Sequence, residues 1–236
     1  MKLKIIGIDT SSDVASVALI SEEKLIGEYT LNFKKTHSER LMPMIDKMLT
    51  DCGCDMSEID GFAVAIGPGS FTGLRIGIAT AKGLAHACNK PVIPVSTLAA
   101  LAYNLPMCEH LIVPIMDARR EQVYTGTYIW DEDVFREIEE PRAVSIEECI
   151  DDCGNFVDVV FVGDGVPVHR EYIISRLGDK AKFAPVGSAL QRGASVAGLG
   201  LENINSGVSC HEVKPVYLRK SQAEREYEEK HQNKGE

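Results

Sequence analysis

The feature that most constrains the fold is a pattern of secondary structure that occurs twice along the chain. An apolar run at residues 3–8 ends at Asp9, and another at residues 111–116 ends at Asp117, 108 positions later. After each run come a polar turn, two further strand patterns, a helix, a strand and a helix. Short connections between the first three strands of each copy predict antiparallel pairing. Two such copies predict an α/β protein of two lobes with mixed sheets.

The boundary between the lobes is expected at residues 104–110, where Pro106 interrupts helical sequence. We therefore expect an N-terminal lobe at residues 1–104 and a C-terminal lobe at residues 105–218. Residues 219–236 hold ten charged side chains out of eighteen, which is typical of a solvated tail.

Two predicted helices of the first lobe have unusual faces. Thr36 and Glu39 have the spacing of a capping box and predict a helix to residue 52, which Pro43 should kink or delay. A glycine-rich loop at residues 67–73 opens a helix that runs to residue 88. Small residues recur in that helix every four positions, at Gly73, Gly77, Ala81 and Ala85. Each helical glycine costs about 1 kcal/mol relative to alanine, so this smooth face predicts a closely packed partner, inside or outside the chain.

Aspartates that end the first strand of each lobe suggest a nucleotide cleft, in which carboxylates hold Mg²⁺ through water. The candidate residues of this site are Asp9, Thr10, Ser11, Asp117 and Arg119. Neither turn contains a glycine to let the backbone approach a phosphate. The alternative is that both aspartates simply satisfy turn amides.

Composition excludes several classes of function. A formal charge of −10 argues against unaided nucleic-acid binding and against docking on an anionic membrane. No apolar run approaches the roughly 18–20 residues of a membrane span, and the start of the chain lacks a signal-peptide core. Seven scattered cysteines suit free thiols in a reducing compartment, so we expect a cytoplasmic protein.

Metal and nucleophile motifs are missing from the sequence. His37 has Leu41, not a second ligand, four residues on, and no H-E-x-x-H occurs. The close cysteine pairs, Cys52 with Cys54 and Cys149 with Cys153, lack the paired spacing of a zinc site. We therefore expect no metal site and no catalytic residues.

Five separated segments resemble the TsaB family, also called YeaZ. They are IGIDTS at residues 6–11, THSERLMP at 36–43, GPGSFTGLRIG at 67–77, DARR at 117–120 and PVYLR at 215–219. The resemblance implies an actin-like (ASKHA) fold of two ribonuclease-H-like lobes. It also implies a role in making threonylcarbamoyladenosine beside the tRNA anticodon.

Members of this family are similar to the catalytic subunit TsaD, which binds metal through an H-x-x-x-H motif. In this chain His37 matches the first histidine, but Leu41 stands where the second would be. The resemblance therefore implies a non-catalytic subunit that pairs with TsaD and, through that pair, with the ATPase TsaE. Contact with tRNA would be indirect, through a basic partner.

In the family the dimer forms through helices that correspond to residues 36–52 and 73–88. The implied interface residues are Leu41, Ile45, Met48, Gly73, Leu74, Gly77 and Ala81. On this interpretation Gly77→Leu abolishes pairing and leaves the chain folded, and the same surface supports a homodimer when TsaD is absent. No cofactor should bind tightly to the isolated chain, but ATP or ADP could occupy a composite site in the complex.

Two rival functions stay open at this point. A small ATPase or kinase of the actin-like fold would need tight Mg²⁺–nucleotide binding between Asp9 and Asp117. A peptidase is suggested by relatives once called glycoproteases, although the sequence lacks a paired metal ligand and a nucleophile–base set.

Overall fold

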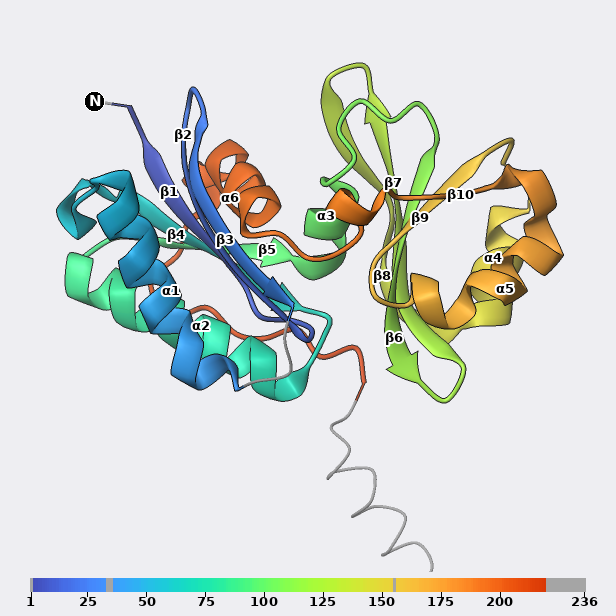
Figure 1. Cartoon of the computed structure of the whole chain (residues 1–236), viewed down its shortest axis with the longest axis horizontal. Coiled ribbons are helices and arrows are strands. Elements are labelled where there is room, and N and C mark those ends of the chain that lie inside the picture. The colour runs from blue at the N-terminus through green and yellow to red at the C-terminus, as the bar shows by residue number, and fades with distance from the viewer. Residues whose placement is uncertain (1, 33–35, 155, 220–236) are drawn as a thin grey trace, which may run out of the picture.

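The computed structural model describes residues 2–32, 36–154 and 156–219, and it has two lobes side by side (Figure 1). The charged tail expected at 219–236 lies outside these residues, except for Arg219. The strands are β1 (Lys4–Asp9), β2 (Val14–Ser21), β3 (Leu25–Asn32), β4 (Gly61–Gly67), β5 (Val92–Ser96), β6 (Leu111–Arg119), β7 (Gln122–Asp131), β8 (Val134–Ser145), β9 (Val159–Val162) and β10 (Ala181–Phe183). The helices are α1 (His37–Cys52), α2 (Phe71–Cys88), α3 (Thr97–Ala102), α4 (Ile146–Cys153), α5 (Val166–Leu177) and α6 (Gly193–Glu202).

The two sheets have the same topology, which confirms the predicted repeat. Their strand orders are β3-β2-β1-β4-β5 and, in the corresponding direction, β8-β7-β6-β9-β10. In the first sheet β1 runs antiparallel to β2 and parallel to β4. In the second, β6 runs antiparallel to β7 and parallel to β9. Both sheets are therefore mixed, and β1 and β6 occupy equivalent central positions.

Local capping at the helix starts agrees with the sequence in one case and differs in another. Ser145 caps α4 by accepting a hydrogen bond from the Glu148 amide over 3.1 Å, as its sequence pattern indicates. Thr36 makes no such side-chain bond to α1, so the predicted capping box is wrong there. Helix α1 also begins at His37 and continues through Pro43, so the proline does not delay its start.

The first sheet is covered on both faces. Helices α1 and α2 lie next to each other on one face, and α6 lies on the other (Figure 1). The side chains of α1 that face the sheet, among them Leu41, Ile45 and Met48, join one apolar core with β1, β2 and β4. Burial of these apolar surfaces is the main force that holds the layers together.

Helix α6 shows that the expected boundary of the C-terminal lobe at residues 105–218 is wrong. A Cβ on Gly193 would lie 2.7 Å from the Ala18 amide nitrogen, so α6 is packed directly on the backbone of β2. Glu28 of β3 accepts from the Ala194 amide over 3.1 Å and pairs with Arg192 at the start of α6. Val213, further on, is buried in the core of the first lobe. The chain therefore returns to the first lobe after the second sheet.

No helix within the described residues is both long enough and apolar enough to cross a membrane.

Candidate functional site: the interlobe cleft and the α1–α2 face

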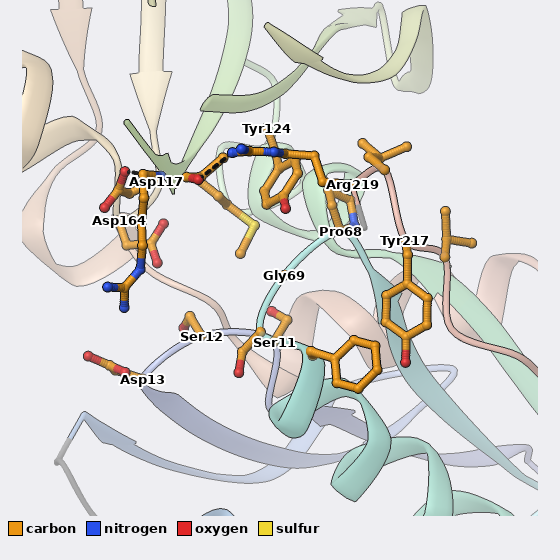
Figure 2. Close-up of a pocket in the computed structure, with 17 residues that line it drawn as sticks. Ser11, Ser12, Asp13, Pro68, Gly69, Asp117, Tyr124, Asp164, Tyr217 and Arg219 are labelled. Carbon is orange, nitrogen blue, oxygen red and sulfur yellow. Dashed lines mark hydrogen bonds between the residues drawn. The ribbon is translucent and has the colours of Figure 1, made fainter. Parts of the chain in front are cut away.

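A cleft of about 350 Å³ lies between the lobes (Figure 2). Its first-lobe side is the turn after β1, with Ser11 to Asp13, together with the loop before α2. Its second-lobe side carries Asp117 and Asp164. The chain near residues 216–219 closes a third side.

Asp9 lies beneath this cleft and does not line it. Its side chain is fully buried, and its Oδ1 accepts from the Ser11 amide at 2.9 Å and from the Ser11 hydroxyl at 2.6 Å. The Oδ2 atom has no hydrogen-bond partner among the described residues. Burial raises the pKa of Asp9 from 3.8 to about 6, although the bonds from Ser11 lower it. This agrees with the alternative that Asp9 ends its strand and satisfies turn groups.

Other polar groups of the turn after β1 are also bonded within the protein. Thr10 donates its hydroxyl to the Gly73 carbonyl at 2.8 Å, and Ser12 donates to Gln191 Oε1 at 2.8 Å. The Ser70 amide donates to the Ser11 carbonyl at 2.6 Å. These donors are directed at protein atoms and are not available to a phosphate.

The glycine-rich loop before α2 covers the Ser11 carbonyl. Gly69 has a φ of 156°, and a Cβ on it would clash with the Ser11 carbonyl oxygen. Ser70 caps α2 by accepting from the Gly73 amide at 3.2 Å. The loop therefore acts as a tight turn that packs on the turn after β1, and the amides of Ser70 and Gly73 are both bonded within the chain.

The second-lobe side of the cleft is acidic. Asp164 follows β9, and burial raises its pKa from 3.8 to about 6, with a further upward contribution from the charges of Asp117 and Asp13. Arg219 donates to the Ala118 carbonyl at 2.6 Å, so its guanidinium is also used within the chain (Figure 2). Arg119 also lines this side of the cleft, beside the two carboxylates. Weak nucleotide binding by the isolated chain stays a prediction. A composite nucleotide site shared with a partner stays a prediction.

The structure thus separates the candidate nucleotide residues into two groups. Ser11, Asp117 and Arg119 line the cleft, whereas Asp9 and Thr10 are buried below it. Asp13 and Asp164 also line the cleft, and the sequence patterns did not identify them as candidates. The Gly163–Asp164–Gly165 stretch at the end of a strand pattern was the available signal for the second of them.

The predicted partner-interface residues are inside the molecule, so that prediction is wrong. Leu41, Ile45, Met48, Leu74 and Ala81 are at most 1% exposed. Gly73 and Gly77 are also buried, and a Cβ on either would clash with Thr10. The reason is that the smooth stripe of α2 packs on the chain's own sheet and turn.

The opposite sides of these helices form an exposed surface, which we call the outer helical face. Its members share exposure and positions away from the sheet: Glu39, Met42, Pro43, Asp46 and Thr50 of α1, and Thr72, Arg75, Ala79, Gly83 and Ala87 of α2. On α2 these residues follow a helical period, and most of them are small.

Leu41, at the position of the second metal-binding histidine of the motif, is also buried in the core. The His37 Nε2 atom lies 2.8 Å from the Ser12 carbonyl oxygen. The pair therefore offers no two-ligand metal site.

Two repeated lobes with an interlobe cleft define the class of actin-like α/β proteins. A solved structure of component A of (R)-2-hydroxyglutaryl-CoA dehydratase from Acidaminococcus fermentans has this fold, with a TM-score of 0.51 and 11% identity over 84% of this chain and 96% of that one. That likeness concerns the fold alone.

Closer relatives define the family. The model of the TsaD family, tRNA N6-adenosine threonylcarbamoyltransferase, matches residues 24–227. The tRNA threonylcarbamoyladenosine biosynthesis protein TsaB of Bacillus subtilis is 35% identical over 223 residues, 94% of this chain and 96% of that protein. The structure of YeaZ from Pseudomonas aeruginosa aligns with a TM-score of 0.77 and 28% identity, and the alignment covers 92% of this chain and 100% of the YeaZ chain. The chain belongs to the TsaB family.

Proposed function

We propose that the chain is a non-catalytic scaffold subunit of the machinery that makes threonylcarbamoyladenosine on tRNA. It pairs with the transferase TsaD and, through that pair, with the ATPase TsaE. The names of its relatives support this assignment. So do the buried Leu41 in place of a second metal ligand and the internally bonded turn in the cleft. The same two features argue against a peptidase and against an independent ATPase.

Gly83 is the observation that best supports docking through the outer helical face. It lies inside α2, where glycine costs about 1 kcal/mol relative to alanine. Gly73 and Gly77 are explained by their contact with Thr10, but a Cβ on Gly83 would meet nothing within 4 Å. No packing among the described residues therefore requires a glycine at this position. A partner helix that packs closely on α2 from outside favours a small residue there.

Charge and composition suit this role. The formal charge of −10 leaves phosphate contacts to a basic partner, so tRNA is bound through the assembly. The cysteines are free thiols, as expected in the cytoplasm, where we place the complex.

The test uses two substitutions at Gly83. Gly83→Arg fills the outer helical face without touching the core, and Gly83→Ala adds one methyl group and serves as the matched control. Light scattering on a sizing column measures the mass of each variant mixed with TsaD, and a reconstituted reaction measures modification of tRNA.

We expect Gly83→Arg to remain folded, to elute apart from TsaD and to lose at least about 90% of tRNA modification, which is a coupling of about 1.4 kcal/mol or more. Gly83→Ala should retain most of both. Wild-type complex formation by Gly83→Arg would exclude this face. Modification of tRNA at the wild-type rate without the chain would exclude the scaffold function itself.

The same face should support a homodimer when TsaD is absent. The wild-type chain is then a dimer at micromolar concentration and Gly83→Arg a monomer. A monomeric wild type would contradict this part of the proposal.

A further inference from the structure

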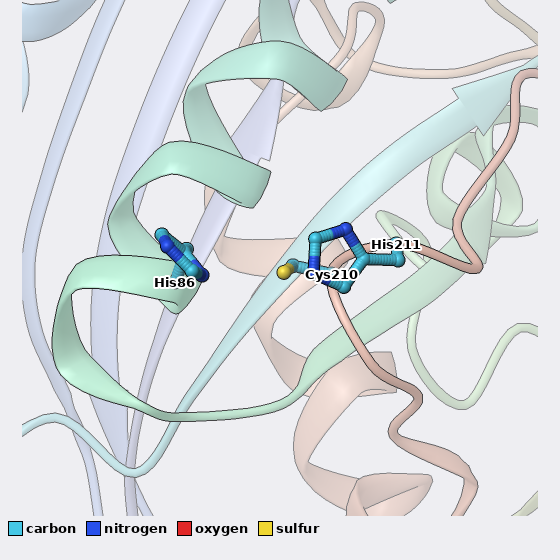
Figure 3. A group of neighbouring side chains, drawn as sticks. All are labelled: His86, Cys210 and His211. Carbon is cyan, nitrogen blue, oxygen red and sulfur yellow. The ribbon is translucent and has the colours of Figure 1, made fainter.

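We infer that His86, Cys210 and His211 form a binding site for a divalent cation of the zinc type. Their ligand atoms, two imidazole nitrogens and one sulfur, all lie within 4.8 Å of one another. His86 is on the last turn of α2, and the other two residues belong to the chain that follows α6 (Figure 3). The cluster adjoins a separate cavity on the first lobe, and none of its three residues lines the interlobe cleft.

The segment that carries Cys210 and His211 is held on both sides of the two ligands. Before them, Val208 exchanges two backbone hydrogen bonds with Val92, at 3.0 and 2.9 Å. After them, the carbonyl of Val213 accepts from Lys82 Nζ at 2.9 Å, and the Val213 side chain is buried in the core. Because Val92 and Lys82 belong to the same lobe as His86, the three ligands are brought together by the fold and not by a freely moving loop.

The distances suit a tetrahedral ion after a small adjustment. Zinc binds imidazole nitrogen at about 2.0–2.1 Å and thiolate sulfur at about 2.3 Å, which places neighbouring ligand atoms about 3.5 Å apart. The ligand atoms are at most 4.8 Å apart here, and His86 and His211 are exposed side chains that can rotate. Closing the site therefore needs the ligand atoms to approach one another by about 1 Å, in the direction that rotation of the two exposed imidazoles allows.

The chemistry of the ligands selects the ion. Two imidazoles and one thiolate are preferred by Zn²⁺ and other late first-row ions, whereas Mg²⁺ and Ca²⁺ require oxygen. A cavity of about 410 Å³ adjoins the three residues and leaves room for a water molecule as fourth ligand. Lys90 lines the same cavity, but its ammonium group lies 3.3 Å from Asp60 Oδ1, which offsets its positive charge.

Binding replaces the S–H bond of Cys210 by a sulfur–metal bond. The thiol proton passes to the buffer, and neither oxidant nor reductant is needed. Bound metal would link the end of α2 to the segment after α6.

The spacing of histidines and cysteines along the chain predicts no metal site, because His86 is far from the other two ligands in sequence. Only the packing of the segment after α6 against α2 brings them together.

The experiment titrates the full chain, freed of metal with a chelator, with Zn²⁺, Co²⁺ and Mg²⁺. Calorimetry in two buffers of different ionisation enthalpy reports affinity and proton release, and Co²⁺ reports thiolate coordination by its near-ultraviolet charge-transfer absorption. Cys210→Ser and His86→Ala each remove one ligand. Cys108→Ser and His110→Ala remove a thiol and an imidazole elsewhere and are the matched controls.

We expect one Zn²⁺ per chain with a Kd below about 10 µM, thiolate absorption with Co²⁺, and no response to Mg²⁺. Each ligand variant should bind at least about tenfold more weakly, and neither control should change the affinity. Zn²⁺ should raise the Tm of the wild type and not that of Cys210→Ser.

A wild-type Kd above about 10 µM would overturn the inference. So would Co²⁺ binding without thiolate absorption, or an affinity that Cys210→Ser leaves unchanged. The wild-type Co²⁺ spectrum decides the matter even where a variant fails to fold.

Discussion

The hydroxyl of Thr10 donates a hydrogen bond to the carbonyl of Gly73 over 2.8 Å. This bond joins the turn after β1 to the first turn of α2. Gly77, one helical turn further on, faces the same threonine, and a Cβ there would clash with the Thr10 Oγ1 atom. The glycines of α2 therefore let the helix lie directly on the chain's own turn.

We expect Gly77→Leu to destabilise the isolated chain. The added side chain must displace a threonine that is fixed by its hydrogen bond, and overpacking a filled core costs about 1–3 kcal/mol or more. The gain in helix propensity, about 1 kcal/mol, does not offset this. Urea unfolding measures the change. This reverses the sequence-based expectation that Gly77→Leu leaves the fold intact, and an unchanged midpoint would show that the packing described here is wrong.

Gly83→Ala is the matched control for that substitution. It lies on the same helix, but the added methyl group meets no atom of the described residues within 4 Å. It should stabilise the isolated chain by about 0.5–1 kcal/mol, through helix propensity and the lower entropy of the unfolded chain.

Asp9 should make stability depend on pH in a recognisable direction. Its pKa in the folded chain is about 6, above the ordinary value of 3.8. The folded state therefore holds the proton more tightly, so this carboxyl stabilises the fold fully below about pH 4 and loses that contribution as the pH rises through about 6. By linkage the loss between pH 4 and 7 is about 2 kcal/mol.

Asp9→Asn removes this titration and keeps an oxygen for the bonds from Ser11. The free energy of unfolding of the wild type, minus that of Asp9→Asn, should fall by about 2 kcal/mol from about pH 4 to 7. Asp133→Asn, on an exposed turn, controls for the loss of a carboxyl at the surface. A difference that is flat or rises with pH would contradict the burial described for Asp9.

Tyr217 should fix the last described residues on α2. Its ring stacks on Phe71 with 4.7 Å between centroids, and its hydroxyl accepts from Arg75 Nε at 3.0 Å. The neighbouring Val216 amide donates to the Ile66 carbonyl at 2.8 Å. Tyr217→Ala removes an aromatic pair and a hydrogen bond, together about 1–2 kcal/mol.

Hydrogen exchange of the Val216 amide measures this effect. A loss of about 1–2 kcal/mol corresponds to exchange roughly 5–30 times faster in Tyr217→Ala. Tyr217→Phe keeps the stacked ring and should change the rate less. Equal rates in all three chains would mean that the tyrosine does not hold this segment.

Much of the fold follows from local patterns. Apolar runs that end at Asp9 and Asp117 are equivalent central strands, as the repeat predicts. Local signals also identify the cap at Ser145. Local signals fail at Thr36, because a capping pattern does not ensure that the side chain turns toward the helix. They also fail at α6, because a helical pattern does not indicate on which lobe the helix packs.

The candidate sites depend more strongly on tertiary structure. Periodicity correctly marks α2 as a helix with one small-residue face, but it does not say what meets that face. In the structure Gly77 packs against Thr10, whereas Gly83 contacts no other described segment. The proposed docking surface is therefore on the other side of the helix from the one predicted. Asp164 enters the cleft because β9 lies beside β6 in the second sheet.

The repeated α/β architecture, the helical positions and the family follow from the amino-acid sequence, because these depend on residue types at short spacings. Tertiary structure alone decided that the stripe with Gly77 faces inward, that Asp9 is buried, and that His86 meets Cys210 and His211. Each of these depends on contact between segments distant in the chain, and such contacts are set by how whole layers bury their apolar surfaces.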